Sequence, residues 1–256
     1  MTENRTGICR IGCAGWTIPR GAAAAFPGEG SHLERYARVF GGVEINSSFY
    51  RPHRPQTYAR WADSVPDDFR FSVKLPRTIS HDAGLRDIAV PLAQFASEVS
   101  ALGGKLGCLL LQLPPKLAFD AGVAADFFDR AAAMFGCMIA CEARHPGWFA
   151  PEATALLAAR NITRGIADPA KGQPGAHEPT SADIYVRLHG SPRIYYSSYS
   201  DDYLDELGRN MAGHAKAGRD VWCIFDNTAS GASVPNALAL VDALRVTPGS
   251  RPVPRA

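Results

Sequence analysis

MIACEAR at 138–144 and IYVRLH at 184–189 are the two segments that indicate the fold most clearly. Each is a short apolar run that ends in charged or ionisable side chains. The same design recurs in ICRIGCAGW (8–16), VEIN (43–46), FRFSVK (69–74), CLLLQ (108–112), ITRGIAD (162–168) and VWCIFD (221–226). Strands buried on both faces read as near-continuous apolar runs, so a polar residue that returns at the same end needs a common cause. Parallel strands whose carboxyl ends open onto one polar site provide that cause.

Helical patterns separate these strands. They cover 32–40, 55–65, 91–104, 124–136, 151–161, 201–218 and 233–245. Alternating strands and helices predict βαβ units with right-handed crossovers, and eight such units predict an α/β fold of the TIM type, a closed parallel (β/α)8 barrel. The stretch PAKGQPGAHEPTSA after Asp168 is rich in proline and glycine and has no helical period. We therefore expect the sixth crossover to be irregular or to lack its helix.

Length and composition indicate one globular domain. The 256 residues are 46% hydrophobic and 20% charged, which suits a single barrel. We expect that domain to span 8–245, with a disordered N-terminus at 1–7 and a disordered tail at 246–256. No apolar run reaches the ~18 residues of a membrane span, and MTENRTG lacks the features of a secretory signal. We therefore expect a cytoplasmic protein without membrane contact.

Charged side chains at the strand ends predict where the site lies. Residues two apart on a strand share a face, so Glu44 points the same way as Asn46, and the pairs Glu142–Arg144 and Arg187–His189 behave likewise. A face covered by helices cannot accept these groups, because a lone buried charge costs several kcal/mol. We expect them to gather at the mouth of the barrel.

The candidate residues fall into two groups by expected role. Expected catalytic residues are Glu44, Lys74, Glu142 and His189. Expected substrate-binding residues are Asn46, Tyr50, Gln112, Arg144, His145, Trp148, Arg187, Tyr199 and Asp226. A glutamate would act as general base and His189 or Lys74 as acid or electrostatic stabiliser, while the arginines clamp phosphate and aromatic rings form the walls. Each group also has a structural alternative: Glu142 with Arg144 as an ion pair, and His189 as a hydrogen-bonded histidine of the interior.

Several segments resemble one known family. In order along the chain they are IGCAGW (11–16), VEINSSFYR (43–51), VKLPRTISH (73–81), LLLQLPP (109–115), EARHPGW (142–148) and VRLHG (186–190). Together they resemble the YecE-like family, also called domain of unknown function 72. The resemblance extends from about Ile8 to Leu244 and implies a TIM-type barrel, but it brings no established reaction.

Two functional hypotheses follow. A third possibility is that the charged residues at the mouth form only a stabilising ion network. The first is an enzyme acting on a phosphorylated or nucleic-acid-related substrate, a hydrolase or isomerase of phosphodiester or sugar-phosphate chemistry. The alternative is a non-catalytic protein that binds a nucleotide or nucleic acid.

The expected ligand is a small anionic or nucleotide-like molecule. A net charge of +2 does not indicate nucleic acid. The G-x-G-x-x-G and G-x-x-x-x-G-K-[ST] fingerprints are absent, so no cofactor is expected. Carboxylate and imidazole groups also suit a divalent metal, although Lys74 and the arginines would compete with it. The sequence does not indicate an oligomeric state.

Overall fold

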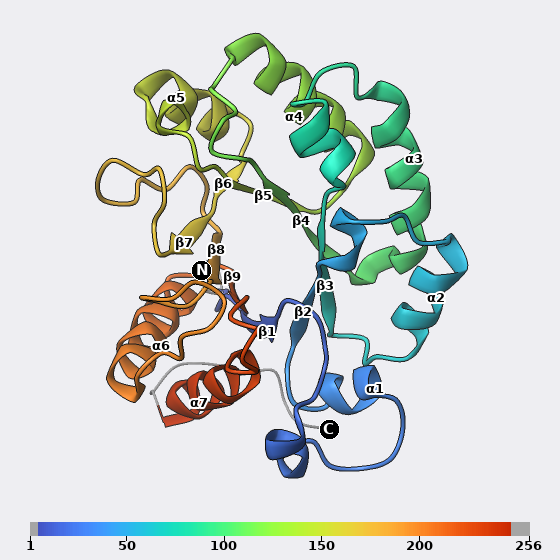
Figure 1. The fold of residues 1–256 in the computed structure, drawn as a ribbon, viewed down its shortest axis with the longest axis vertical. Helices are drawn as coiled ribbons and strands as arrows, with labels where there is room; N and C mark the ends of the chain where they lie inside the picture. The colour runs from blue at the N-terminus through green and yellow to red at the C-terminus, as the bar shows by residue number, and fades with distance from the viewer. Residues whose placement is uncertain (1–4, 247–256) are drawn as a thin grey trace.

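Parallel strands form the centre of the molecule, and the helices surround them (Figure 1). The computed structural model describes residues 5–246. Within that part of the chain the strands are β1 (Cys9–Cys13), β2 (Gly42–Ile45), β3 (Arg70–Lys74), β4 (Leu106–Gln112), β5 (Met138–Glu142), β6 (Thr163–Arg164), β7 (Ile166–Asp168), β8 (Ile184–Leu188) and β9 (Val221–Phe225). They form a four-stranded sheet in the order β1-β9-β8-β7 and a five-stranded sheet in the order β2-β3-β4-β5-β6.

The parallel α/β fold is as predicted, but one closed eight-stranded sheet is not confirmed. The predicted strand at 162–168 is divided at Gly165: β6 pairs with β5, whereas β7 pairs with β8. At the other junction, β1 and β2 are joined by an isolated bridge between Ala14 and Glu44. The two sheets therefore meet at a divided strand and at a single bridge.

A tyrosine hydroxyl explains the second junction. The Tyr36 hydroxyl accepts a hydrogen bond from Cys13 N at 2.7 Å and lies 3.3 Å from Gly42 O, to which it donates. It thus stands in for a ladder bond between β1 and β2. Gly12 permits this close approach, since a Cβ there would lie 2.1 Å from Gly42 O.

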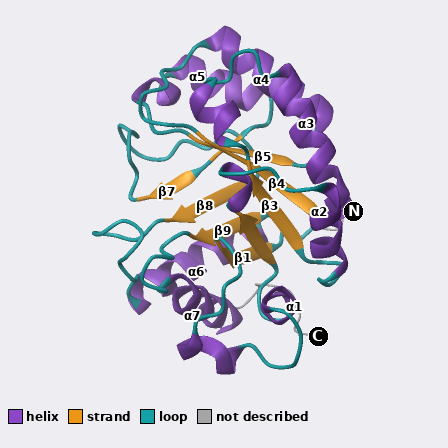
Figure 2. Ribbon diagram, turned by 45° about the vertical axis from the view of Figure 1, so that its right-hand side comes forward, coloured by secondary structure: helices purple, strands orange, loops and turns teal. Residues whose placement is uncertain are grey.

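The helices lie on the outer side of both sheets (Figure 2). They are α1 (His32–Ala37), α2 (Pro55–Asp63), α3 (Ala89–Val99), α4 (Ala121–Met134), α5 (Pro151–Ala159), α6 (Asp201–Lys216) and α7 (Ser233–Val246). Every predicted helix is present, and local signals set several starts: Ser31 forms a capping box with Glu34, and Asp120 and Ser200 cap α4 and α6. No helix lies between Asp168 and Ile184, as predicted for the sixth crossover.

Short turns of helix lie in the connections; four of them come after strands and one comes directly after α3. They are η1 (Arg20–Ala25), η2 (Ser47–Phe49), the π-turn η3 (Thr78–Asp82), η4 (Ser100–Lys105) and η5 (Pro146–Phe149). Two of these, η2 and η3, follow β2 and β3 directly and shape the surface beside the predicted site.

Alternation along the strands produces two buried clusters. Leu109 and Leu111 of β4 belong to the main core beneath the helices, whereas Cys108 and Leu110 face inward with Tyr185. The inner cluster draws residues from β4 and β5 of one sheet and from β8 and β9 of the other, so the two sheets share an interior. The charged side chains lie at the carboxyl end of that interior.

The chain ends differ in detail from expectation. Residues 1–4 and 247–256, most of the two segments expected to be disordered, lie outside the described residues. Arg5 pairs with Asp220 at 2.8 Å, and Gly7 N donates to Ala215 O at 2.8 Å. These contacts place Arg5 and Gly7 with the folded domain, and Val246 is the last residue of α7. None of the helices in 5–246 combines the length and apolar character needed to cross a membrane.

Candidate functional site

Arg187 is the centre of a buried ion network. Its guanidinium binds both oxygens of Glu44, with Nε–Oε2 at 2.9 Å and Nη2–Oε1 at 2.8 Å. It also binds Glu142 Oε2 at 2.7 Å and Asp226 Oδ2 at 3.0 Å. The side chains of Arg187, Glu44 and Glu142 are at most 1% exposed. A single guanidinium on β8 therefore joins β2 and β5 of the other sheet.

Tyr185 and Ser72 complete the floor of this network. The Tyr185 hydroxyl lies 3.1 Å from Glu44 Oε2, to which it donates, and 2.6 Å from Ser72 Oγ. Neither residue was among the expected site residues. The signal was present in the sequence, because Tyr185 lies two residues before Arg187 on the same strand and so shares its face.

Ionisation of the carboxylates is strongly favoured. Burial alone would raise the pKa of Glu142, but the charge of Arg187, a hydrogen bond to His189 and the charge of Arg144 hold that pKa well below its usual value. The pKa of Asp226 is likewise lowered, because Arg187 and His189 outweigh the effect of burial. Both groups are therefore carboxylates engaged by cations at neutral pH, which makes them poor general bases.

His189 has a partner on each ring nitrogen. Nδ1 lies 2.9 Å from Asp226 Oδ2, while Nε2 lies 3.3 Å from Glu142 Oε1 and 3.0 Å from Arg144 Nη2. Burial of the ring opposes protonation, but the hydrogen bonds to Asp226 and Glu142 outweigh it and raise the pKa of His189 above its ordinary value. Protonated, Nε2 donates to Glu142; neutral, it accepts from Arg144. The His189 ring therefore has hydrogen-bond partners in both of its protonation states.

Lys74 is a buried cation of a different kind. Among the described residues its ammonium has no hydrogen bond and no ion pair, and it lies 4.2 Å from the centre of the Phe49 ring. Burial lowers the pKa of Lys74, and the charge of Arg187 lowers it further against the attraction of Glu44, Asp226 and Glu142. Lys74 thus shares the electrostatic environment of the network without being neutralised by contact.

The accessible face of the cluster is more cationic than its interior. Arg144, bound to Glu142 through Nε at 2.9 Å, keeps 14% of its side chain exposed. Lys74 is 6% exposed and the Asp226 side chain 9%, whereas His189 is 1% exposed. Three carboxylates balance Lys74, Arg144 and Arg187, so protonation of His189 would leave one positive charge. We call Glu44, Lys74, Glu142, Arg144, Arg187, His189 and Asp226 the strand-end cluster.

Other expected residues take different places. Asn46 follows β2, and Gln112 is the last residue of β4. Among the described residues, Asn46 Oδ1 is buried and has no hydrogen-bond partner. Trp148 packs against Phe119 and donates from Nε1 to Leu117 O at 3.0 Å, so it belongs to the core and not to the cluster.

Three loop residues also lie apart from the cluster. His145 caps η5 by accepting from Gly147 N at 3.0 Å. The Tyr199 hydroxyl accepts from Gly190 N at 2.9 Å and lies 3.0 Å from Asp168 Oδ1, so it ties two loops together. Tyr50 is 75% exposed. Tyr50 lines a groove beside the cluster.

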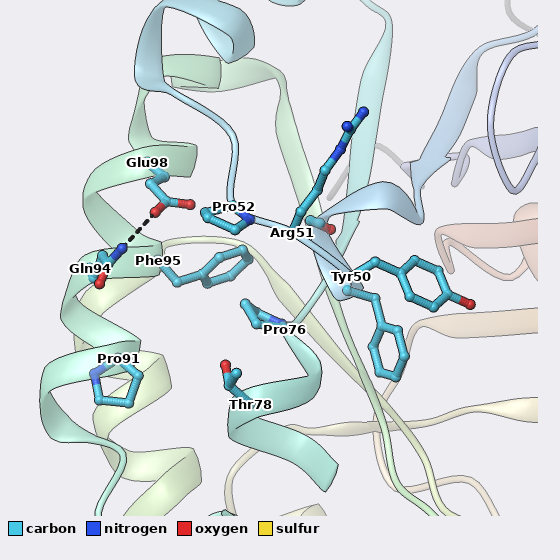
Figure 3. Close-up of a pocket in the computed structure, with 11 residues that line it drawn as sticks. Tyr50, Arg51, Pro52, Pro76, Thr78, Pro91, Gln94, Phe95 and Glu98 are labelled. Carbon is cyan, nitrogen blue, oxygen red and sulfur yellow. Dashed lines mark hydrogen bonds between the residues drawn. The ribbon is translucent and has the colours of Figure 1, made fainter. Parts of the chain in front are cut away.

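A groove lies beside the cluster, between the loops after β2 and β3 and helix α3 (Figure 3). Its volume is about 330 Å³. The lining residues are Ser48, Phe49, Tyr50, Arg51, Pro52, Pro76, Thr78, Pro91, Gln94, Phe95 and Glu98. We call it the α3 groove. Phe49 lines it and also lies over Lys74, so one ring separates the groove from the cluster.

The described residues contain no group of three or more His, Cys, Asp or Glu side chains arranged to hold a metal ion. In the strand-end cluster the carboxylates instead contact Arg187, Arg144 and His189. What the cluster offers chemically is a cationic rim above a histidine that is paired with an aspartate.

These features define an α/β protein with parallel sheets and a polar site at their carboxyl ends. The chain belongs to the family described as protein of unknown function DUF72, whose model matches residues 10–256. This confirms the family resemblance seen in the sequence.

Relatives and solved structures agree with that assignment. The UPF0759 protein YecE of Escherichia coli K12 is 34% identical over 141 residues, 55% of this chain and 50% of YecE, and YecE of E. coli O157:H7 matches equally. The chain spans about half the length of the curated relatives it matches. A DUF72 family protein of Enterococcus faecalis V583 has a TM-score of 0.77 at 19% identity, covering 94% of this chain and 96% of that one. One from Thermotoga maritima MSB8 has a TM-score of 0.76 at 21% identity, covering 93% and 99%.

Proposed function

We propose that the protein is an enzyme that binds a small phosphorylated substrate at the strand-end cluster and acts on it by acid–base chemistry, as a hydrolase or an isomerase. The observation that carries this proposal is the buried ammonium of Lys74, which has no hydrogen bond or ion pair among the described residues, in a cluster where Arg144 keeps 14% of its side chain exposed. A buried cation without a counter-ion is costly for the protein alone and is compensated when an anion binds. In this proposal the two sheets act as the frame of a TIM-type barrel, with the substrate at its carboxyl end.

The residues of the cluster then divide into three roles. Lys74 and Arg144 hold the anion, the guanidinium by a two-pronged hydrogen bond. His189, with Nδ1 held by Asp226, exchanges a proton with the substrate through Nε2. Glu44 and Glu142 suit the general-base role expected for them poorly, because Arg187 binds both oxygens of Glu44 and Oε2 of Glu142, while Arg144 binds Oε1 of Glu142. We assign them the positioning of Arg187 and His189.

Arg144 would also control access to His189. Its Nη2 lies 3.0 Å from His189 Nε2 and is the more exposed of the two groups. An anion that binds Arg144 would draw the guanidinium toward itself and free Nε2 for the substrate. This acid–base chemistry uses only side chains of the protein. That the protein needs no cofactor remains a prediction.

The test is phosphorus NMR on a pool of sugar phosphates, nucleotides and phosphodiesters incubated with the wild-type protein. A consumed resonance identifies the substrate, and His189→Asn should then slow turnover by about 10²–10⁴-fold, the usual contribution of a proton-transferring side chain. Lys74→Met should raise the KM, whereas Lys216→Met, on the exposed face of α6, should change neither constant.

Two results would decide against the enzyme. A compound that raises the melting temperature but is never consumed favours non-catalytic nucleotide binding. Full turnover by His189→Asn would remove the acid–base assignment.

A further inference from the structure

The α3 groove has the size and walls of a site for a flat apolar group. Its volume of about 330 Å³ falls at the lower end of small-molecule sites. Pro52, Pro76, Pro91 and Phe95 contribute to the walls, and Figure 3 shows the Phe95 ring of α3 pointing toward Pro52 and Pro76 of the loops. Rigid ring faces of this kind suit the stacking of a planar heterocycle.

One polar group gives the groove its specificity. Glu98 is 9% exposed, and its Oε1 accepts a hydrogen bond from Gln94 Nε2 at 3.1 Å. Among residues 5–246 no lysine, arginine or histidine pairs with Glu98. An ionised carboxylate accepts hydrogen bonds and cannot donate them, so a ligand in the groove must present N–H or O–H groups to it.

Neighbouring cations select among such donors. Arg51 lines the groove, and Lys74 lies behind the Phe49 ring. A ligand ammonium would be attracted by Glu98 but repelled by both cations, whereas a neutral ring with an exocyclic amino group provides the N–H donors without that repulsion. The groove therefore fits an aminated heterocycle better than an alkylamine.

The groove and the anion site share a wall. Phe49 lines the groove, and the centre of its ring lies 4.2 Å from Lys74 Nζ. Ser48, the preceding residue, donates from Oγ to Lys74 O at 2.6 Å, which fixes the η2 turn to the end of β3. A ligand with a ring and a phosphate could occupy both places by passing the edge of Phe49.

We infer that the α3 groove binds the amino-bearing base of a mononucleotide whose phosphate lies at Lys74 and Arg144, with Glu98 accepting from the exocyclic amino group. This inference rests on the proposed function for the phosphate half and on the groove alone for the base half. The two halves can therefore be tested separately.

The experiment is calorimetric titration of the full-length protein with adenosine, inosine, inorganic phosphate and adenosine monophosphate. Inosine carries a carbonyl oxygen where adenosine carries the amino group, so it is the matched control ligand. Wild type should bind adenosine at least about tenfold more tightly than inosine, as expected for a hydrogen bond to a charged group.

Glu98→Gln should bring the adenosine-to-inosine ratio close to one, because an amide can donate to the inosine carbonyl. Glu152→Gln, an exposed acidic residue on α5, is the control variant and should leave the ratio unchanged. Lys74→Met should weaken inorganic phosphate and adenosine monophosphate and leave adenosine unaffected.

The outcomes separate the two proposals. If adenosine and inosine bind equally, or Glu98→Gln leaves their ratio intact while phosphate binding still depends on Lys74, the base assignment is wrong and the proposed function stands. If adenosine binding depends on Glu98 but phosphate does not bind, the proposed anion site is wrong. Tighter binding of adenosine monophosphate than of adenosine in wild type, lost in Lys74→Met, supports one ligand spanning both places.

Discussion

Lys74 shows how a functional residue can oppose the stability of the fold. Its ammonium is desolvated, and its lowered pKa means that the charged form is less favourable in the folded chain than in the unfolded one. Methionine has a similar length and no charge. We therefore expect Lys74→Met to raise the free energy of unfolding at pH 7, by about 1–2 kcal/mol. Urea denaturation of the variant beside wild type measures this, and a clear loss of stability would mean that the ammonium has a partner in solution.

His189 should make stability depend on pH. Its folded pKa is raised, so its interaction with Asp226 and Glu142 is fully present below its unfolded pKa of about 6.5 and is lost as the pH rises through the folded value. The two carboxylates stay ionised over this range because their pKa values are lowered. His189→Asn should therefore cost more stability at about pH 5.5 than at about pH 9. Denaturant titrations at both values test the sign; a larger cost at the higher pH would contradict it.

The alternation of side chains along strands predicted the positions of the cluster residues better than those of the loop residues. Glu44, Glu142 and Arg187 converge because each strand direction fixes the side of its alternate residues. No comparable rule fixes a loop side chain. Trp148 and His145 follow β5 by a few residues, yet the η5 turn directs one into the core and leaves the other as a cap.

At the scale of elements, the junction of β1 and β2 depends on a side chain. Tyr36→Phe would leave Cys13 N and Gly42 O without the hydroxyl that joins them in the interior. A buried backbone group without a partner costs about 1–3 kcal/mol, and we expect a loss of stability in that range. Chemical denaturation measures it, with Tyr50→Phe as the control because Tyr50 is 75% exposed. Equal stability of both variants would show that water replaces the Tyr36 hydroxyl.

Element positions followed from periodicity, whereas sheet continuity did not. The helices α2, α4 and α6 begin and end within a few residues of the predicted segments, since capping residues and apolar spacing are local signals. The division of the sixth strand is not local. Gly165 N donates to Cys141 O of β5, and the next residue, Ile166, already pairs with Val186 of β8. Which neighbour a residue pairs with depends on both flanking strands, and a single-strand pattern contains no such information.

At the scale of the molecule, the ion network lies where the two sheets face each other. Arg187 belongs to the four-stranded sheet, and its partners Glu44 and Glu142 belong to the five-stranded one. In the described part of the chain the backbone junctions between the sheets are the divided strand and the bridge at Ala14, and hydrogen bonds of Tyr36 and Tyr185 also link the two sheets. The cluster therefore serves the fold and the site together, because the ion pairs of Arg187 cross from one sheet to the other.

This arrangement predicts a large effect from one substitution. Arg187→Met would leave Glu44 and Glu142 buried without their main cation, and breaking a buried pair in this way costs about 3–5 kcal/mol. Arg209→Met, on the exposed surface of α6, is the matched control and should cost little.

A second substitution distinguishes loss of charge balance from loss of packing. Glu44→Gln removes the charge of one of the two carboxylates that Arg187→Met leaves without their main cation. The double variant Arg187→Met with Glu44→Gln should therefore recover part of the stability that Arg187→Met loses. Urea denaturation of both single variants and the double variant gives the interaction energy, and hydrogen exchange shows whether β3 and β9 lose protection together. A cost below about 1 kcal/mol for Arg187→Met, or exchange that rises in one sheet alone, would mean that the helices and not Arg187 hold the sheets against each other.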